Sequence, residues 1–297
     1  MVTERDLELS TGSIDSQALR LIKLADLSNI NRFDGENFDG ARMIHQTTLN
    51  THEARTKALL FQANNALRAA GVDIDNFRAG YVLGVHDDHE VLTKDIPSPV
   101  KLMMSSEERE QLRNQEEAAI RILVERYMLA EFHDLYLELW HEAQAKETPE
   151  AQAADIADKW DGVCETLHEI RCSNTDFLEV LERYRSFILP RVEKHKVWPA
   201  ISSHPHIQLD RIPTPGEADQ LPKISLGTLR GLGYDAFWKE VFDPKLPEFY
   251  KRWMTATFRC GLPLKTPGTP LFPGWPNEGL EQDPKMYLLM VPHQKIR

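Results

Sequence analysis

The chain has 297 residues, 41% of them hydrophobic, so it can form one large domain or two modest ones around a real core. Its net charge of −11 excludes a broad cationic surface for a nucleic acid polymer, while a local cluster of cations could still bind a small anion. No apolar run approaches the roughly 18 residues of a membrane span. The N-terminus lacks the apolar stretch of a secretory signal, and three cysteines without a Cys-x-x-Cys pair favour a reducing compartment, so we expect a cytoplasmic protein.

Helical patterns fill the first two thirds of the chain, where no segment predicts a strand, so we expect an all-α fold. Apolar periodicity predicts helices over residues 13–30, 51–71, 73–92, 105–128, 131–146, 148–172 and 175–194. Start signals such as Thr148 followed by Pro149 support these boundaries. The third helix becomes almost wholly apolar toward its end, so we expect it to be buried and to deliver His86 and Asp87 at its C-terminal end.

The composition changes near Pro190. Most of the 18 prolines and four of the six tryptophans lie from there onward, and a single helical pattern, at 233–258, lies among them. Such an aromatic segment is unlike a disordered linker. We therefore expect two parts: a helical domain over 1–190, and an irregular extension over 191–297 that packs on the helical body or on a second subunit.

Two histidines and two acids form a candidate metal centre. His52 lies at the start of one predicted helix, His86 and Asp87 end another, and Asp158 lies on a third. One imidazole from each of two helices plus two carboxylates suits a divalent transition metal such as Mn, Co, Fe, Ni or Zn. An open site of this kind lowers the pKa of bound water and polarises a phosphoryl oxygen.

Each of these residues also has a simpler interpretation. A single histidine on a helix is more often a surface or core residue than a ligand, and adjacent His-Asp pairs occur by chance. Asp155 and Asp161 are as plausible as Asp158 from the residues of that helix alone. Cys164 and Cys172 have the spacing of packing residues on the same helix.

A resemblance to a known family supports the interpretation of these four residues as metal ligands. The string "HDDHEVLTKDIPSPVK" over 86–101 resembles the motif of the HD-domain metal-dependent phosphohydrolases, and within them the 5′-deoxynucleotidase branch. Upstream, "INRF" resembles the Asn-Arg-Trp of that branch, and downstream the spacing from Ala157-Asp158 to Phe177 matches an Ala-Asp helix followed by Asn-x-Glu-Phe. This spacing favours Asp158 over its neighbours. The resemblance covers roughly residues 16 to 190.

The resemblance implies an HD-domain helical bundle and a role for each matching residue. One divalent metal would be held by His52, His86, Asp87 and Asp158. Arg32 would bind the phosphate through two hydrogen bonds of its guanidinium. Glu90 would position or deprotonate the attacking water, or protonate the leaving oxygen, and Asp95 would lie near the sugar and that oxygen. Homodimers formed through helices are a further implication of the family.

Three departures from the pattern bear on nucleotide preference. Phe33 stands where the branch has the tryptophan that reads the sugar, Lys94 stands where it has a glycine, and Thr51 replaces the glutamate before the metal-binding histidine. We therefore count Phe33 and Lys94, with Arg32, as candidate substrate-binding residues.

The favoured reaction is hydrolysis of a (deoxy)nucleoside 5′-monophosphate to nucleoside and phosphate, with a small-molecule nucleotide as the substrate. A dNTP triphosphohydrolase on the same fold is the nearest alternative, and extra cations near Arg32, with Arg42, Lys57 and Lys94 as candidates, would favour it. A non-catalytic binding or scaffold protein with a structural metal is a second alternative. A scaffold would not need an acid beside the metal, whereas this chain has two, Glu90 and Asp95. A two-iron oxygenase would need additional ligands.

Overall fold

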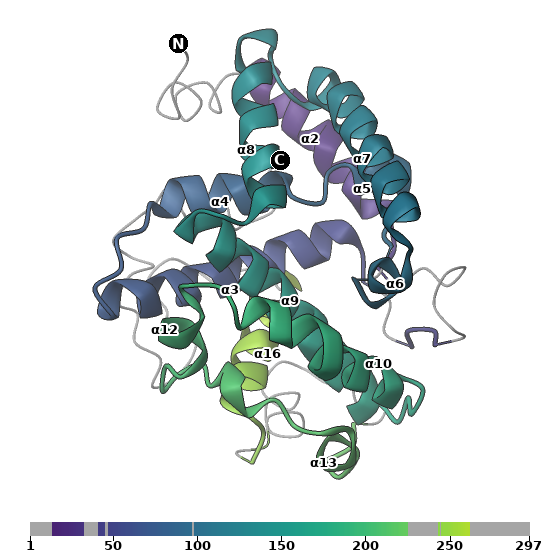
Figure 1. Cartoon of the computed structure of the whole chain (residues 1–297), viewed down its shortest axis with the longest axis vertical. Helices are drawn as coiled ribbons and strands as arrows, with labels where there is room; N and C mark the ends of the chain where they lie inside the picture. Colours follow the sequence, from purple (N-terminus) through teal and green to yellow (C-terminus); the bar gives the residue numbers. More distant parts are fainter. Residues whose placement is uncertain are drawn as a thin grey trace, which may run out of the picture.

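The computed structural model describes residues 14–32, 41–44, 47–96, 98–224, 243 and 245–261. These residues form a bundle of helices, and none of them lies in a strand apart from an isolated bridge between Asn31 and Thr48 (Figure 1). The α-helices are α2 Ile14–Ser28, α3 Leu49–Ala69, α4 Asn76–Val85, α5 Glu90–Thr93, α6 Ser98–Met103, α7 Ser106–Tyr127, α8 His133–Ala145, α9 Pro149–Arg171, α10 Phe177–Arg183, α11 Leu189–Val192, α12 Trp198–Ser202, α13 Pro215–Asp219 and α16 Glu248–Gly261. Two 3-10 helices, η1 Ala130–Phe132 and η3 Leu209–Arg211, and one π-helix, η2 Tyr184–Ile188, complete the described elements. The expected all-α fold is confirmed.

Side chains at the helix starts explain several boundaries. Asp75 caps α4 by accepting hydrogen bonds from two backbone N–H groups, and Ser105 forms a capping box with Glu108 at the start of α7. Thr148 caps α9, with Pro149 at the first helical position as expected. These caps satisfy N–H groups that have no partner within the helix.

The predicted helix over 73–92 is wrong in its last third. Helix α4 ends at Val85, a turn follows over residues 86–89, and the short α5 begins at Glu90. His86 and Asp87 do lie at the C-terminal end of the apolar helix, as expected. In this turn the backbone hydrogen bonds run from the Asp88 N–H to the Val85 carbonyl and from the Glu90 N–H to the Asp87 carbonyl, three residues apart, so the α-helical pattern is interrupted.

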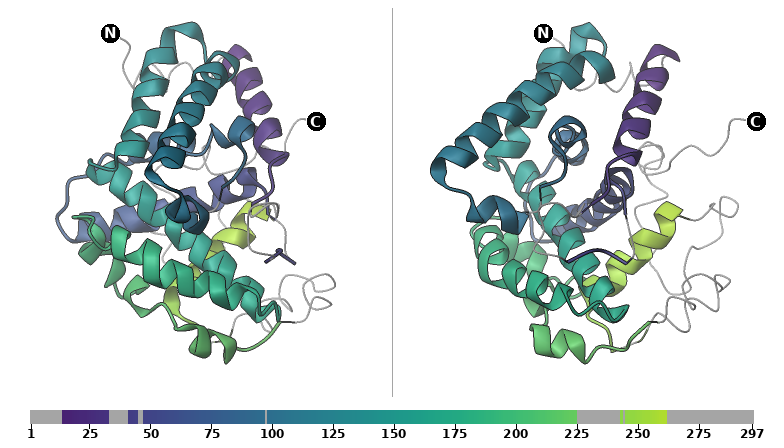
Figure 2. Two further views of the ribbon diagram at one scale, coloured as in Figure 1. Left: turned by 45° about the vertical axis from the view of Figure 1, so that its right-hand side comes forward. Right: turned by 90° about the vertical axis from the view of Figure 1, so that its right-hand side faces the viewer.

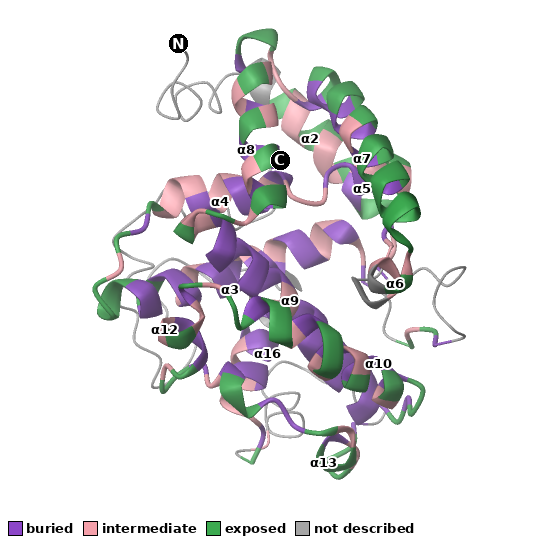
Figure 3. Cartoon of the chain, in the orientation of Figure 1, coloured by how far each residue is buried: buried purple, intermediate pink, exposed green. Residues whose placement is uncertain are grey.

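Helix α9 is the centre of the bundle and is buried along almost its whole length (Figure 3). It packs against α3, α4, α8, α10 and α16. Its apolar side chains are fully covered, with Ile156 and Val163 at 0% exposure. The same helix buries five carboxylates: Asp155, Asp158, Asp161, Glu165 and Glu169. Buried carboxylates are costly unless they meet cations or hydrogen-bond donors, so this helix indicates where the chemistry lies.

Residues after 190 pack on the helical body where the structure describes them. Helix α16 lies against α3 and α9 (Figure 2), with Phe249, Tyr250 and Trp253 buried at its contact. The indole N–H of Trp160 donates to the carbonyl of Phe249 at 3.0 Å. The predicted helix over 233–258 is correct from residue 248 onward and wrong at residues 243 and 245–247, which are described and not helical; residues 233–242 and 244 lie outside the described residues.

The described residues also bear on the cysteines and on membrane spans. Cys164 and Cys172 are buried and free, in agreement with packing roles. No described helix is both long and apolar enough to span a bilayer.

Candidate metal centre

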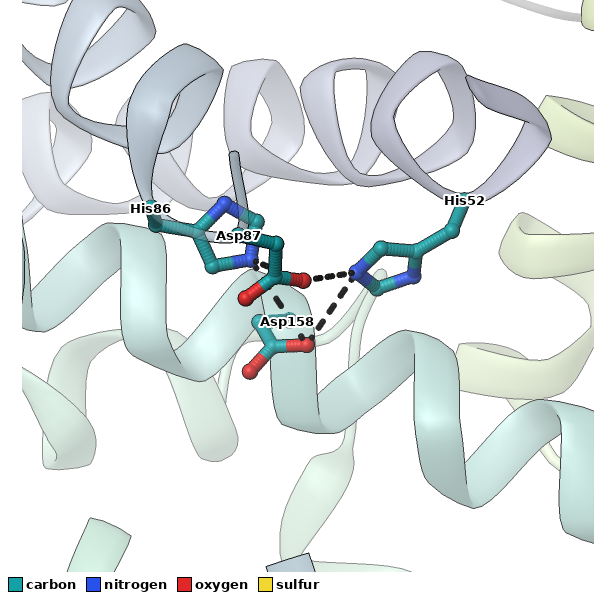
Figure 4. Close-up of side chains that lie close together, drawn as sticks. All are labelled: His52, His86, Asp87 and Asp158. Atoms are coloured by element: carbon teal, nitrogen blue, oxygen red, sulfur yellow. Dashed lines mark ion pairs between the residues drawn. The ribbon is translucent and has the colours of Figure 1, made fainter. Parts of the chain in front are cut away.

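Three helices bring the four predicted ligands together (Figure 4). His52 comes from α3, His86 and Asp87 follow α4, and Asp158 comes from α9. One ligand atom of each residue lies within 4.8 Å of the others. The Nε2 atom of His52 is 3.4 Å from Asp87 Oδ2 and 3.3 Å from Asp158 Oδ1, and His86 Nε2 is 3.0 Å from Asp87 Oδ2. Among the described residues, this is the one group of three or more such side chains with this spacing.

The convergent atoms have no ordinary hydrogen-bond partners in the described structure. His52 Nε2, His86 Nε2 and Asp87 Oδ2 are buried and make no hydrogen bond. The other nitrogen of each imidazole is engaged: His52 Nδ1 with Asp161 Oδ2 and His86 Nδ1 with the Leu83 carbonyl, each at 2.6 Å. Donation from Nδ1 leaves Nε2 to offer its lone pair toward the shared point. A donor set of this kind fits a divalent cation.

The electrostatics of the centre favour positive charge. Burial and Arg32 oppose protonation of His52, yet the carboxylates of Asp158, Asp161 and Asp87 raise the pKa of its imidazole well above the ordinary value. Burial likewise opposes protonation of His86, but Asp87 and Asp158 raise its pKa to about 9. The carboxylates that hold protons on these rings would hold a metal cation for the same reason.

A second layer of residues orients His52. Asp161 accepts hydrogen bonds from Arg55 Nε at 2.8 Å and from the indole N–H of Trp253 at 2.6 Å. Arg55 also pairs with Glu165 and lies over the Trp253 ring. Asp161 is therefore a support behind His52, on the opposite side of the ring from Asp158. Asp155 lies elsewhere, since its carboxylate pairs with Lys146 and His195.

Trp253→Phe is expected to weaken metal binding by up to about tenfold, because it removes one hydrogen bond that fixes Asp161 and hence His52. Trp160→Phe is the matched control, since it removes a buried indole N–H bond on the same contact with α16 but none to Asp161. Metal titration by calorimetry on both variants checks this. Equal affinities in the two variants would contradict the coupling.

Arg32 lies beside the candidate metal centre, with three carboxylates around its guanidinium. Its guanidinium is 3.8 Å from Asp87 Oδ2, 3.9 Å from Asp95 Oδ2 and 3.5 Å from Glu165 Oε2. Its backbone N–H donates to the Thr47 carbonyl at 2.8 Å, which fixes the segment before α3. Arg32 is 7% exposed. A buried guanidinium held by several carboxylates is a rigid cation next to the candidate ligands.

Glu90 and Asp95 are both buried near the centre. Burial, together with the charges of Asp87 and Asp95, raises the pKa of Glu90 well above its ordinary value, against the opposing charges of Lys101 and Arg32. Glu90 Oε2 is buried and makes no hydrogen bond within the described part of the chain. An acid held in this way can exchange a proton with a bound molecule.

Lys94 has a backbone conformation that suits glycine. Its φ of 70° and ψ of 158° lie in a region that is essentially reserved for glycine, and the side chain is exposed. The departure from the glycine of the resembling motif therefore has a backbone cost beside Asp95.

Lys94→Gly is expected to stabilise the protein by about 1 kcal/mol, since relief of about 1–3 kcal/mol of strain outweighs about 0.5–1 kcal/mol of added chain entropy. Thermal unfolding should shift upward by about 2–4 °C. Lys94→Ala, which removes the same charge but keeps the strained backbone, should give no such gain. A similar rise in both variants would assign the effect to the charge.

Some expected site residues lie elsewhere or outside the described part. Phe33 is outside the described residues. Lys57 pairs with Glu53 at 2.6 Å, so it is occupied by a structural contact. The supports Arg55, Asp161 and Glu165 were not assigned from the sequence. Residues 158, 161 and 165 share one face of a helix, and this spacing is the signal that could have found the last two.

A cavity of about 360 Å³ opens beside the centre. Three of the four candidate ligands, His86, Asp87 and Asp158, form part of its wall. Six cations also line it: Lys101, Arg109, Arg113, Lys146, Lys159 and Arg191. This group of cations could not be recognised from the sequence, because its members come from several segments that are far apart in the chain.

A helical bundle that brings two histidines and two aspartates together is what the resemblance to the HD-domain phosphohydrolases implies for this chain. The family model described as 5′-deoxynucleotidase YfbR-like matches residues 20–197. The chain belongs to the YfbR-like 5′-deoxynucleotidase family, and it is accordingly a hydrolase of the nucleotide phosphohydrolase type. No curated protein matches the chain in sequence.

Three solved structures have folds that are similar to part of this chain. An HD-domain phosphohydrolase from Listeria innocua is 22% identical, with 63% of this chain and 93% of that chain covered and a TM-score of 0.47. The PH0347 protein from Pyrococcus horikoshii is 19% identical, with 70% and 98% covered and a TM-score of 0.48. A conserved hypothetical protein from Pyrococcus furiosus is 21% identical, with 62% and 99% covered and a TM-score of 0.42.

Proposed function

We propose that this chain hydrolyses (deoxy)nucleoside 5′-monophosphates to nucleoside and inorganic phosphate, with the help of one divalent transition metal. The observation that carries the proposal is the convergence of His52 Nε2, His86 Nε2 and Asp87 Oδ2, buried without hydrogen bonds, next to the guanidinium of Arg32. This arrangement offers a cation site and a fixed cation side by side. A phosphate monoester requires both, and the family membership supports the reaction class.

His52, His86, Asp87 and Asp158 would hold the metal. When bound, the metal supplies Lewis acidity toward a phosphoryl oxygen and toward water. The mixed nitrogen and oxygen donors suit Mn, Co, Fe, Ni or Zn.

Three residues next to the ligands are assigned roles toward the substrate. Arg32 binds the phosphate, because a planar guanidinium donates two parallel hydrogen bonds to phosphate oxygens. Glu90 exchanges a proton with the attacking water or with the leaving 5′ oxygen. Asp95, whose carboxylate is 3.9 Å from Arg32 Nε, orients Arg32 and accepts a hydrogen bond from a sugar hydroxyl. Phe33 and Lys94 remain proposals for contact with the nucleoside.

Product analysis on the purified full chain tests the reaction. Panels of 5′-monophosphates and dNTPs are incubated under Mn, Co, Mg and Zn, with Asp87→Asn as the inactive reference. Inorganic phosphate and nucleoside from monophosphates are the expected products. Bound metal with no release from any substrate would favour the binding or scaffold alternative.

We further propose that residues 191–297 are an extension belonging to the helical body, and that the protein acts in the cytoplasm. The packing of Phe249 and Trp253 against α9 supports the first point. A chain truncated after Pro190 is expected to aggregate or to unfold at lower temperature, because it exposes the apolar surface under α16. Scattering and thermal unfolding of the truncated chain check this. A soluble and fully active product would mean that the extension is a separate module.

We also propose that the chain forms a homodimer. Light scattering on the full chain measures its mass in solution and checks this.

A further inference from the structure

The cavity beside the metal centre is cationic in an acidic chain. Six lysine and arginine side chains line it against four carboxylates, and two of these four, Asp87 and Asp158, belong to the centre. The chain as a whole has a net charge of −11. Cations gathered around one hollow repel one another, so their excess indicates a site for an anion.

The lysines and the arginines of the cavity differ in their partners. Each lysine is paired with a carboxylate: Lys101 with Glu116, Lys146 with Asp155 and Lys159 with Asp158. Arg109, Arg113 and Arg191 are exposed and make no ion pair or hydrogen bond of their side chains with other residues in the part of the chain that the structure describes. These three guanidiniums are available to a ligand.

The position of the arginines links them to the centre. Arg109 and Arg113 are one turn apart on α7 and so share a face, and Arg191 comes from α11. The cavity that they line reaches His86 and Asp87, whereas Arg32 and Asp95 are not among its lining residues. The described residues of the wall include no Phe, Tyr or Trp on which a base could stack.

We propose that this cavity binds the β- and γ-phosphates of a nucleoside triphosphate, so that the centre also cleaves the 5′ ester of a triphosphate. The inference rests on the proposed function and deepens it. The α-phosphate lies at the centre next to Arg32, the nucleoside lies on the side of Asp95, and the remaining phosphates extend toward the three arginines. Guanidinium groups suit this role because each can bind phosphate oxygens in pairs.

The reaction balances without a further reactant. Water adds to the α-phosphorus, the bond from that phosphorus to the 5′ oxygen breaks, and the 5′ oxygen takes up a proton. The products are nucleoside and tripolyphosphate. The same bond is cleaved in a monophosphate, where the other product is orthophosphate.

Binding of inorganic tripolyphosphate to the full chain, measured by calorimetry without added metal, tests the cavity directly. The triple variant Arg109→Gln, Arg113→Gln, Arg191→Gln is expected to bind about 10- to 100-fold more weakly, since hydrogen bonds to charged groups are lost. The control is the triple variant Arg68→Gln, Arg121→Gln, Arg211→Gln, which removes the same charge from exposed arginines that do not line the cavity. Equal affinity in both triple variants, or no binding by the parent chain, overturns the inference.

Turnover of the metal-loaded chain provides a second readout. The cavity variant should lower kcat/KM for a dNTP at least about tenfold more than kcat/KM for the matching dNMP, with the loss mainly in KM. Parallel losses on both substrates contradict a site for the additional phosphates. Cleavage of monophosphates alone by the parent chain refutes this inference and leaves the proposed function intact. Cleavage of neither substrate refutes the proposed function, and the calorimetry still decides whether the cavity binds polyphosphate.

Discussion

Asp87→Asn is expected to abolish metal binding and turnover together. Asp87 Oδ2 faces both imidazoles, at 3.0 Å from His86 Nε2 and 3.4 Å from His52 Nε2, and it makes no hydrogen bond. Burial opposes ionisation of Asp87, but the charge of His86 and the close approach of both imidazoles hold the pKa of its carboxyl well below the ordinary range. Partners outside the ligand shell already contribute about 10- to 100-fold to metal affinity, so loss of a ligand carboxylate should cost more than that.

Metal content by mass spectrometry and phosphate release are the two measurements for this variant. Asp88→Asn is the matched control, because its carboxylate is adjacent in sequence but pairs with Lys23 at 2.7 Å and with Tyr136. Asp88→Asn should retain metal. Unchanged metal content and turnover in Asp87→Asn would remove Asp87 from the centre, and loss of metal in both variants would point to misfolding of the turn.

Glu90→Gln is expected to lower turnover strongly without a loss of bound metal. Glutamine keeps the size of the side chain but cannot transfer a proton, so kcat should fall by about 10²–10⁴-fold while bound metal stays at the parent level. Glu90→Ala is expected to behave in the same way. The buried Oε2 without a hydrogen bond is the atom that would contact water or substrate.

Glu53→Gln is the comparison for Glu90. Glu53 is also buried, but its carboxylate pairs with Lys57 at 2.6 Å and takes no part in the proposed centre. A loss of metal in Glu90→Gln would make Glu90 a ligand, not a proton-transfer group. Equal turnover in the Glu53 and Glu90 variants would leave Glu90 without a catalytic role.

Most of the fold could be predicted because helix signals are local. Thr148 with Pro149 and the apolar spacing of 148–172 are sufficient to place α9. The break between Val85 and Glu90 was missed, because a run of Asp and His residues does not contain the Gly or Pro that usually marks a helix end. The π-helix over Tyr184–Ile188 was also not predicted. Its first residue packs on α9, where the Tyr184 hydroxyl lies so close to Gly162 that a Cβ there would overlap it, and this contact between distant residues has no local signal.

The candidate ligands could be predicted from order and spacing, but their surroundings could not. On α9, Asp155, Asp158 and Asp161 look alike in sequence, and the partner that each one meets depends on which helix packs against its face. Exposed arginines such as Arg109 and Arg113 on an amphipathic helix have the pattern of a solvated surface. They become the wall of a cavity only because α11 folds beside them. The hydrogen bond from Trp253 to Asp161 could not be predicted for the same reason, because α16 and α9 are far apart in the sequence.

Trp253 has a consequence for the order in which the centre is completed during synthesis. All four candidate ligands have been made once the ribosome passes residue 158, but the indole that holds Asp161 is added only with residue 253. A nascent chain therefore presents its ligands before the support that orients His52. The affinity for the metal should therefore reach its full value only after residue 253 has been made, and a shorter product that already contains all four ligands should bind the metal more weakly.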